Sequence, residues 1–440
     1  MIKRIIVGES GGPTPVIDWE VSGVVEAAQM AGIEVYGMIN GLEGVLNADI
    51  EGNIVDLTGV DHMALAFNGP GAGLRTTRIK PTAEQYRIIA RNLEAFGIDG
   101  VVYIGGNDSA AQLQGLTAVS GVRAIHAIKT VDNDLPVTHH CPGYGSAALY
   151  NAIALKNVNN DFSSYKAWGN FDRGGRVVKS LSVAPVVIYQ VMGRKAGWLA
   201  QGTAFARVDP KGDMIPNYPP QIILSKEITF DKQEFLDSLA GVLDRVGSGV
   251  VVVQEDLTDR ATGRALAEIH AEKVVIDAHG NIQHGRAGSF APCIFLARLI
   301  KAELKVDSIL GEIKDAVLAP QHIQRSYVMS PPDASDAFRV GFAAVRALLD
   351  GEDRKSVILK RENGRTATGL TDLANIAGRE KSVPLSLING LHGPTQEFID
   401  EYLYLIGGPM AIPHYSSHYF KSVSVPEEVR KHPYLKPEVK

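Results

Sequence analysis

The chain has 440 residues, of which 45% are hydrophobic and 21% are charged, and this composition is typical of a globular protein with room for two ordinary domains. A formal net charge of -5 without any long run of Lys or Arg argues against a nucleic-acid-binding surface. No apolar run approaches the roughly 18 residues of a membrane span, and the two cysteines, Cys141 and Cys293, have no metal-ligand spacing, so neither a disulfide framework nor a zinc site is expected.

The chain begins with a predicted strand rather than with a targeting segment. Its first residues, MIKRIIVGES, lack the small-residue cleavage region of a signal peptide. We therefore expect a cytoplasmic protein that acts on small molecules and has neither a nucleic-acid nor a membrane partner.

Short β-branched runs alternate with helical patterns along the chain. The predicted strands are RIIVGES, GVVYIGG, GVRAIHAIK, VVIYQVMG and GSGVVVVQED, with a helix from Ser22 to Ala31 after the first and a helix from Asp108 after the second. This alternation predicts an α/β fold with parallel sheets covered by helices on both faces. Polar or glycine-rich turns follow several strands, at the edge where such sheets bind ligands. The polar segment from Lys166 to Ser180 is predicted to be a long loop.

Two glycine-containing stretches early in the chain are candidate phosphate sites. Gly11 and Gly12 follow the first strand, where they allow either a close approach of phosphate to the backbone or only a tight turn. In NGPGAGLRTTR, Arg75 and Arg78 are either bidentate phosphate donors or solvated surface charges. Neither stretch matches a Walker loop or the GxGxxG pattern.

The stretch YIGGNDSAAQ places Asp108 and Ser109 at the start of a predicted helix. A helix N-terminus attracts phosphate, so a carboxylate there either caps the helix or selects an unusual ligand.

The most concentrated set of polar residues is IKTVDNDLP, directly after a predicted buried strand. Lys129, Thr130, Asp132 and Asp134 place a cation, a hydroxyl and two carboxylates in one short loop. Phosphoryl transfer to an alcohol requires such a set, namely a base, cations for the phosphate oxygens and ligands for magnesium. The alternative is a solvated charged turn, and we favour the catalytic interpretation.

Later stretches add candidate substrate contacts. VMGRKAGW supplies Met192, Gly193 and Arg194 after a predicted strand. QHIQR supplies His322 and Arg325, each of which is either a phosphate contact or a surface charge.

Two further candidates have simple alternatives. Glu255 ends the strand VVVVQED, where it either accepts protons from sugar hydroxyls or caps a helix. His414 and His418 have helical metal-ligand spacing, but Pro413 before them and the YSS between them favour a loop over a metal site.

Six features follow one another along the chain: SGGP, GGNDS, KTVDND, MGRKAGW, a strand-ending Glu and HIQR. In this order they resemble the phosphofructokinase family, from Met1 to roughly Asp350. The later LANIAGREKSVPLSLING is similar to the C-terminal region of its long, pyrophosphate-dependent members. The resemblance implies that Asp132 is the base for the sugar 1-hydroxyl, assisted by Lys129 and Arg194. It also implies two sets of binding residues. The contacts to the sugar substrate are Thr130, Asp134, Met192, Gly193, Arg194, Glu255, His322 and Arg325. The contacts to the phosphoryl donor are Gly11, Gly12, Arg78, Asp108, Ser109 and Lys129.

The resemblance also suggests a role for Asp108. Members that use ATP carry glycine at the positions of Asp108 and Lys129, whereas members that use pyrophosphate carry Asp and Lys. The Asp108 side chain would obstruct the α-phosphate of a nucleotide, and Lys129 would neutralise charge on the compact pyrophosphate.

The resemblance also implies the architecture of the family for this chain. It implies two Rossmann-like lobes with mainly parallel sheets and an active site in the cleft between them. Residues 1–141 and 322–440 would form the phosphoryl-donor lobe and residues 142–321 the sugar lobe. The implied reaction is reversible, Mg2+-dependent transfer from pyrophosphate to the 1-hydroxyl of fructose 6-phosphate by a homodimer or homotetramer.

Some positions depart from the family pattern. Asn107 stands where many members have a magnesium-binding Asp, which leaves Asp108, Asp132 and Asp134 as metal candidates. Asp18 replaces a common Asn, and Arg75 replaces a glycine. Pro185 and Ala316 occupy positions that are often basic and that bind the sugar 6-phosphate. One alternative is therefore a kinase for another acceptor, such as a polyol, inositol or a different sugar phosphate. The other is a non-catalytic regulatory subunit that binds sugar phosphate. The retained Asp132 argues against the regulatory subunit.

Overall fold

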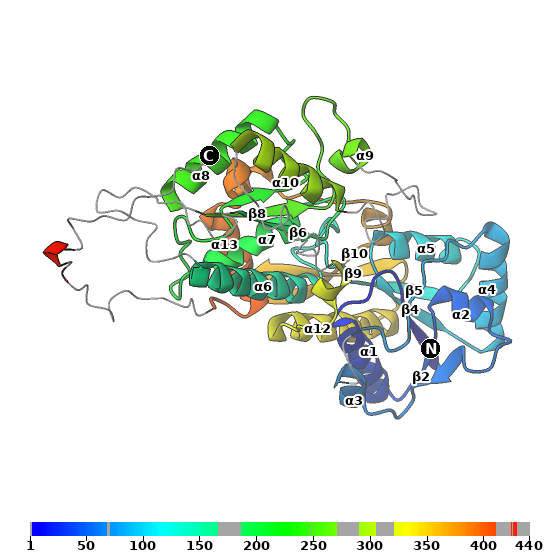
Figure 1. Cartoon of the computed structure of the whole chain (residues 1–440). Helices are drawn as coiled ribbons and strands as arrows, with labels where there is room; N and C mark the ends of the chain where they lie inside the picture. Colours follow the sequence, from blue (N-terminus) through cyan, green and yellow to red (C-terminus); the bar gives the residue numbers. More distant parts are fainter. Residues whose placement is uncertain are drawn as a thin grey trace.

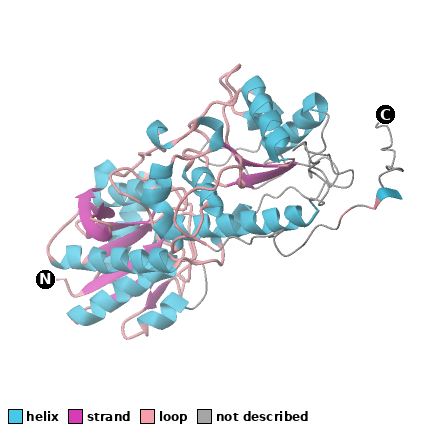
Figure 2. Ribbon diagram, turned by 90° about the vertical axis from the view of Figure 1, so that its left-hand side faces the viewer, coloured by secondary structure: helices cyan, strands magenta, loops and turns pink. Residues whose placement is uncertain are grey.

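The computed structural model of the chain describes residues 2–67, 71–165, 186–246, 248–270, 290–304, 321–410, 424 and 426–428. Its strands form two separate sheets, each with helices packed against it (Figures 1 and 2). Most neighbouring strands are parallel, so the predicted α/β class is confirmed. All five predicted strands are present, and their ends differ from the prediction by at most two residues.

The larger sheet has seven strands in the order β10-β9-β5-β4-β1-β2-β3. Its strands are β1 (Arg4–Glu9), β2 (Glu34–Met38), β3 (Ile54–Asp56), β4 (Gly100–Gly105), β5 (Arg123–Ile128), β9 (Lys355–Glu362) and β10 (Arg365–Asp372). The five inner strands run parallel, and β3 and β10 are antiparallel edge strands. The inner strands are continuous apolar runs because both faces of the sheet are covered.

Six helices cover this sheet: α1 (Ile17–Ala31), α2 (Leu42–Leu46), α3 (His62–Phe67), α4 (Ala83–Ala95), α5 (Asn107–Thr117) and α12 (Pro331–Leu349). α1 begins five residues before the predicted Ser22, with Asp18 and Glu20 in a first turn that favours negative charge, and it ends at Gly32 with a φ of 65°. α4 begins with a capping box in which Thr82 and Gln85 bond each other's backbone N–H groups.

The smaller sheet has the order β6-β8-β7, with all three strands parallel. Its strands are β6 (Val186–Val191), β7 (Ile222–Leu224) and β8 (Gly249–Gln254). The α-helices of this region are α6 (Tyr144–Tyr165), α7 (Trp198–Gly202), α8 (Lys232–Val246), α9 (Leu266–His270), α10 (Ala291–Leu304) and α13 (Gln396–Tyr402). Short 3-10 helices connect the elements, and they are η1 (Thr203–Arg207), η2 (Gln321–Arg325), η3 (Leu373–Asn375), η4 (Leu385–Leu387), η5 (Gly390–His392) and η6 (Leu403–Ile406).

The C-terminal part of the described chain contacts both sheets. β9, β10 and α12 complete the seven-stranded sheet, whereas Phe398 of α13 stacks on Trp198 and Phe205 in the core of the smaller sheet, with ring centroids 6.1 and 5.8 Å apart. The division into a donor lobe of residues 1–141 and 322–440 and a sugar lobe of residues 142–321 stays a prediction.

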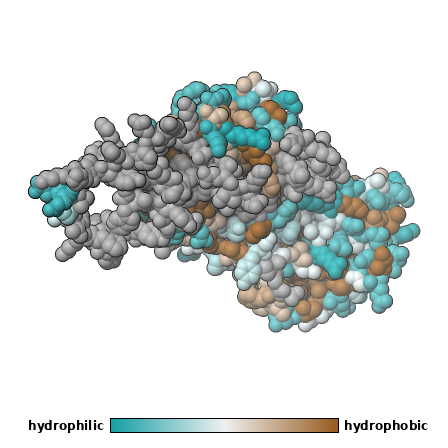
Figure 3. Space-filling view, in the orientation of Figure 1, coloured by the Kyte–Doolittle hydropathy of each residue, from teal (hydrophilic) through white to brown (hydrophobic). Residues whose placement is uncertain are grey.

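The described surface is mixed in character. In the view of Figure 3, hydrophilic and hydrophobic residues are interspersed over the part that contains the seven-stranded sheet. Across the described ranges, no helix combines the length and the apolarity needed to cross a membrane.

The helices α1 and α12 lie side by side although they are far apart in sequence (Figure 1). Glycines allow this close packing: a Cβ at Gly23 would overlap the carbonyl oxygen of Phe338, and one at Gly341 would overlap that of Glu20. Backbone therefore packs directly on backbone at this crossing.

We expect Gly341→Ala to lower the free energy of unfolding by about 1–3 kcal/mol, because the clash outweighs the better helix propensity of Ala. Chemical denaturation measures the change. Gly121→Ala is the control, since a Cβ there meets open space, and it should leave stability within about 1 kcal/mol of the wild type. Equal stability of the two variants would contradict the packing described here.

Candidate active site

Three turns meet at the carboxyl-terminal edge of the seven-stranded sheet. They follow β1, β4 and β5, which are adjacent and parallel. Ser109 Oγ donates to Ser10 Oγ at 2.9 Å, which joins the β4 turn to the β1 turn. The backbone N–H of Lys129 donates to the carbonyl of Gly105 at 2.9 Å, which joins the β5 turn to the β4 turn. The predicted donor residues are thus assembled by the register of three neighbouring strands.

Lys129 is 2% exposed and lies under the Gly11–Gly12 turn. Its Nζ donates to the carbonyl oxygens of Ser10 at 2.8 Å and Gly12 at 2.6 Å. Burial lowers the pKa of Lys129 to about 8, against the attraction of Glu20 and Glu9. A solvated charged turn is therefore the wrong interpretation of this stretch: the cation is desolvated and held by backbone dipoles beside the turn.

Asp108 is exposed in the first turn of α5 and does not cap the helix. The helix begins one residue earlier than predicted, at Asn107, and its N-cap is Gly106, so the capping interpretation was wrong. Asn107 Oδ1 instead accepts the backbone N–H of Asp108 at 2.9 Å. The Asp108 carboxylate is therefore available to a ligand at the helix N-terminus.

The loop after β5 is ordered by its own polar side chains. The N–H of Asp132 donates to Thr130 Oγ1 at 3.1 Å, and Asn133, with a φ of 51°, accepts the N–H of Cys141 on Oδ1 at 2.9 Å. Asp132 is partly exposed, whereas Asp134 is buried.

The two carboxylates of this loop titrate under different influences. Burial raises the pKa of Asp132, and the positive charges of Arg194 and Arg325 oppose the shift. Burial, with the repulsion of Asp132, raises the pKa of Asp134 to about 7. The charge of Arg194 acts on Asp132, and Arg194 follows β6. The end of the smaller sheet therefore faces the loop that follows β5.

Glu255 and Gly193 are joined at the ends of β8 and β6. Glu255 Oε1 accepts the N–H of Gly193 at 3.2 Å, and burial, followed by the charge of Asp132, raises the Glu255 pKa to about 7. No described helix begins at Glu255, since α9 starts at Leu266, so the capping interpretation was wrong.

The 3-10 helix η2 brings Arg325 to the donor turn. Its guanidinium lies so close to Gly12 that a Cβ there would overlap it. Arg325 is 8% exposed, and its Nε has no hydrogen-bond partner in the described part of the structure. Burial lowers the pKa of Arg325, opposed by Asp132. His322 is exposed on the same helix, and partial burial and the charges of Arg325 and Arg78 lower its pKa.

Gln324 was missed by sequence reasoning. Its Oε1 accepts the N–H of Met192 at 3.3 Å and the side chain of Asn151 at 3.0 Å, and Tyr189 donates to Asn151 at 2.9 Å. This buried network holds the turn after β6 against η2. An amide between two motifs carries no sequence pattern that would have identified it.

Arg75 and Arg78 are exposed on the segment that runs beside the Gly11 turn. Thr76 Oγ1 donates to the carbonyl of Gly11 at 2.6 Å, and the N–H of Gly11 donates to the carbonyl of Thr77 at 3.2 Å. Gly11 has a φ of 78°, so the turn itself requires glycine.

The crossing segment, residues 378–383, connects the two sheets. It lies within the stretch LANIAGREKSVPLSLING, but its contacts at the site were not predicted. Glu380 accepts from Asn107 Nδ2 at 3.0 Å and pairs with Lys195 after β6. Asn107 is thus engaged by a carboxylate from the stretch LANIAGREKSVPLSLING, far along the chain.

Lys381 is the most connected residue of the crossing segment. Its N–H donates to the carbonyl of Asp134 at 2.6 Å, and its Nζ donates to the carbonyls of Thr138 at 2.6 Å and His139 at 2.9 Å. Its own carbonyl accepts from Trp198 Nε1 at 3.3 Å. The segment therefore fixes the loop after β5 against the smaller sheet.

Several predicted features lie outside the described residues. They are the loop from Lys166 to Ser180, the positions Pro185 and Ala316, and the pair His414 and His418.

The described carboxylates do not form a complete metal cage. Within the described ranges, no three His, Cys, Asp or Glu side chains cluster closely enough to hold a metal. Mg2+ commonly takes one or two protein carboxylates and completes its shell with water and substrate phosphates. Asp108 and Asp132, on neighbouring turns and at least partly exposed, fit that requirement.

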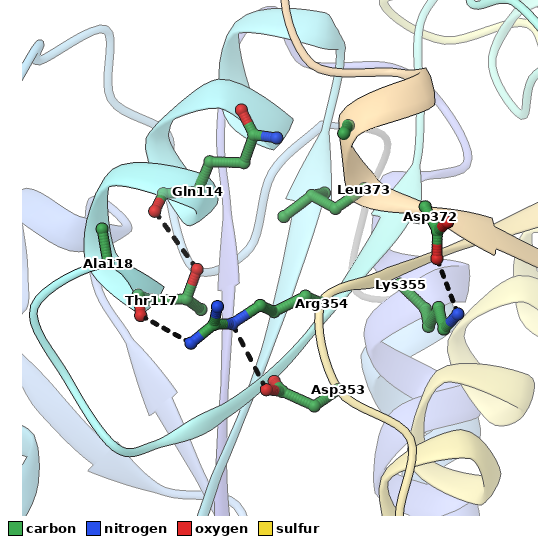
Figure 4. A pocket seen from close by; sticks show the side chains of 9 residues that line it. Gln114, Thr117, Ala118, Asp353, Arg354, Lys355, Asp372 and Leu373 are labelled. Atoms are coloured by element: carbon green, nitrogen blue, oxygen red, sulfur yellow. Dashed lines mark hydrogen bonds and ion pairs between the residues drawn. The ribbon is translucent and has the colours of Figure 1, made fainter.

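A pocket of about 460 Å3 lies at the opposite end of α5 from Asp108 (Figure 4). Its charged side chains are paired within the pocket: Arg354 with Asp353 at 3.4 Å, and Lys355 with Asp372 at 2.6 Å. None of the predicted site residues lines it, so its location does not change the candidate site.

Comparison with known proteins identifies the family. The Phosphofructokinase family profile matches residues 4–170. The pyrophosphate--fructose 6-phosphate 1-phosphotransferase of Rhodospirillum rubrum is 32% identical over 92% of this chain and 95% of its own length. A crystal structure of a pyrophosphate-dependent phosphofructokinase from Nitrosospira multiformis, 27% identical, superposes over 94% of both chains with a TM-score of 0.74. An ATP-dependent 6-phosphofructokinase 3 from Bacteroides thetaiotaomicron is 26% identical over 86% of this chain and 94% of its own.

The fold and the ordered turns are those of a sugar-phosphate kinase of the α/β class. The chain belongs to the phosphofructokinase family, as the resemblance predicted.

We expect Lys381→Met to lower the free energy of unfolding by about 1.5–3 kcal/mol, because two partly buried charge-assisted hydrogen bonds are lost. Lys355→Met is the matched control, since the exposed pair with Asp372 should contribute no more than about 1 kcal/mol. Urea denaturation of both variants compares the two effects. If Lys381→Met is as stable as Lys355→Met, the crossing segment does not hold the loop after β5.

Proposed function

We propose that the protein is a pyrophosphate-dependent phosphotransferase that phosphorylates the 1-hydroxyl of fructose 6-phosphate, reversibly and with Mg2+. The relatives of Rhodospirillum rubrum and Nitrosospira multiformis, whose names specify pyrophosphate, support this choice of donor. Since an ATP-dependent relative also matches, family membership alone does not decide the donor.

The observation that carries the proposal is the pair of charges at the donor turns. Lys129 is buried under the Gly11–Gly12 turn with its ammonium on backbone carbonyls, and Asp108 is exposed at the N-terminus of α5. An exposed carboxylate there disfavours the longer polyphosphate chain of a nucleotide, which would have to pass it. The buried ammonium favours a compact anion at the turn.

Asp132 accepts the proton of the sugar 1-hydroxyl in this mechanism. Its carboxylate is partly exposed, and its pKa is raised by burial against the charges of Arg194 and Arg325, which suits a general base. Arg194 neutralises charge that develops on the transferring phosphoryl group, and Lys129 neutralises charge on the leaving phosphate. Asp108 and Asp132 would hold Mg2+, which would supply further positive charge for the phosphate oxygens.

The acceptor sugar is held at the ends of the smaller sheet and by η2. Thr130, Asp134, Met192, Gly193 and Glu255 are the proposed contacts to its hydroxyls. His322 and Arg325 are the proposed contacts to its 6-phosphate, and the unpartnered Nε of Arg325 supplies a donor for it. Gly11, Gly12, Arg78 and Ser109 complete the donor site.

The assembly and the location are further parts of the proposal. The resemblance supports a homodimer or homotetramer in the cytoplasm, with the donor site in residues 1–141 and 322–440 and the sugar site in residues 142–321.

An assay of purified protein with Mg2+ tests the donor and the acceptor together. Pyrophosphate and ATP are each offered with fructose 6-phosphate, sedoheptulose 7-phosphate, inositol and unphosphorylated polyols, and the phosphorylated products are quantified. We expect product from pyrophosphate with fructose 6-phosphate, and at least about a hundredfold less from ATP, the effect of one lost transition-state contact.

Other outcomes separate the alternatives. Product from ATP alone would contradict the proposed donor. Product with only a non-phosphorylated acceptor or with a different sugar phosphate would favour a kinase for another acceptor, as Pro185 and Ala316 suggest. Binding of fructose 6-phosphate without turnover would favour a regulatory subunit.

We expect Asp132→Asn to lower kcat by about 10²–10⁴-fold, because an amide cannot accept the hydroxyl proton, while the dissociation constant for fructose 6-phosphate changes little. Steady-state kinetics and calorimetric binding measure the two quantities. Asp244→Asn, an exposed position on α8, is the matched control. A parallel loss of sugar binding would mean that Asp132 positions the substrate rather than accepting its proton.

A further inference from the structure

One buried amide at the end of the smaller sheet holds the turn that carries Arg194. Gln254 is the last residue of β8, the central strand of this sheet, and its side chain is fully buried. Its Nε2 donates to the carbonyl oxygen of Gly193 at 2.8 Å and to that of Ala196 at 3.1 Å. Both bonds reach the turn after β6, so Gln254 fastens this turn to the neighbouring strand.

The two bonded carbonyls lie on either side of the central residues of the turn. Gly193 and Ala196 are buried, whereas Arg194 is half-buried and Lys195 is exposed. A turn that is held at both flanks leaves its central residues little conformational freedom. Because the charge of Arg194 acts on Asp132, the held turn carries a cation that faces the proposed base.

The oxygen of the same amide is also bonded, on the other side of β8. Gln254 Oε1 accepts the N–H of Lys226 at 2.7 Å, in the segment that follows β7. The network therefore fixes which way the amide points, because a flipped amide would place its oxygen against the carbonyls of Gly193 and Ala196. One side chain thus joins the ends of all three strands of the smaller sheet.

The backbone of Gly193 is bent toward this amide. Its φ is 123°, in the range that favours glycine. A Cβ there would lie 3.1 Å from the carbonyl oxygen of Ala196 and 3.4 Å from Gln254 Nε2. The N–H of Gly193 donates to Glu255 Oε1 at 3.2 Å, so two consecutive residues bind the carbonyl and the N–H of one glycine.

Other side chains hold the ends of the turn, and they do so in a different way. Glu227 Oε1 accepts the N–H of Gly197 at 2.8 Å, and Gln324 Oε1 accepts the N–H of Met192 at 3.3 Å. Both are acceptors for backbone N–H groups. Gln254 instead donates, and it does so to carbonyls on both sides of the central residues, so these acceptors do not replace it.

We propose that Gln254 is a positioning residue for Arg194 and sets its guanidinium in place for the transferring phosphoryl group. The part in phosphoryl transfer rests on the proposed function. The hold of Gln254 on the turn does not, because it is a property of the protein without substrate. Since the turns of the proposed donor site follow strands of the larger sheet, we expect the effect on the chemical step rather than on donor binding.

Gln254→Met tests the role, because methionine has about the length of glutamine but donates no hydrogen bond. We expect kcat to fall about tenfold to a hundredfold, with a change of less than about threefold in the KM for pyrophosphate, since the chemical step depends on the placement of Arg194. Gln233→Met, at an exposed position on α8, is the matched control and should keep the wild-type kinetics. A loss of stability with an unchanged kcat would mean that Gln254 has only a structural role.

A double-mutant cycle tests whether Gln254 acts through Arg194. Arg194→Met alone should lower kcat at least as far as Gln254→Met does. Adding Gln254→Met to Arg194→Met should then lower kcat by no more than about threefold further, because the group to be positioned is already gone. Losses that multiply in the double variant would contradict positioning of Arg194.

Hydrogen exchange tests the hold on the turn without substrate. In Gln254→Met, peptides covering residues 192–198 should lose about tenfold or more in protection, because two hydrogen bonds to the turn are lost. Peptides covering residues 8–14, at the donor turn of the larger sheet, should keep the protection of the wild type. Unchanged protection at residues 192–198 would overturn the proposal, whatever the kinetics show.

Gln254→Glu is a second variant that keeps the length of the side chain and still accepts from Lys226, but its carboxylate donates to neither carbonyl. We expect the same losses from it. If neither variant folds, exchange of residues 192–198 in the wild type at the rate of an unstructured peptide would overturn the proposal.

The same comparisons separate this inference from the proposed function. If the enzyme uses another donor or acceptor, kcat is compared with the pair that is turned over, and the same fall is expected. Absence of turnover with every pair would overturn the catalytic part, and the exchange result would still decide whether Gln254 holds the turn.

Discussion

The buried ammonium of Lys129 is the interaction on which the candidate site depends. By donating to the carbonyls of Ser10 and Gly12, it holds the turn after β1 against the turn after β5. Without it, two carbonyls would point into a desolvated space with no donor, and that arrangement is costly. The same cation attracts the carboxyl groups of Glu20 and Glu9, and its charge opposes the rise that burial causes in the pKa of both.

A second feature is that the site is assembled from distant parts of the chain. The three donor turns come from neighbouring strands, but Arg325 arrives through η2, and Glu380 and Lys381 arrive through the crossing segment. Asn107, where the family often has a metal ligand, bonds Glu380 instead. Glu380 also pairs with Lys195, so the same later segment couples the turn after β6 to α5.

The sequence predicted the parts of the fold that local patterns determine. Apolar β-branched runs such as those ending at Gly105 and Ile128 fix strands, and the order of the motifs identified the family. It did not predict that Glu380 bonds Asn107 or that Gln324 bonds the turn after β6, because these contacts join residues far apart in sequence with no periodicity between them. Asp108 was ambiguous because Asp is common at N-caps, and only the position of the first helical turn decided against a cap. The roles assigned to the site residues stay predictions.

The place of β9 in the larger sheet has a consequence for how the chain is made. Ile125 of β5 pairs with Lys355 of β9, and the whole smaller sheet is synthesised between them. During vectorial synthesis the outer edge of β5 therefore stays unpaired while α6, β6, β7 and β8 emerge, and an open apolar edge is a template for wrong partners. Non-local pairing of this kind slows folding, so the nascent protein depends on that edge being shielded, by the growing chain itself or by a chaperone, until its last strand arrives.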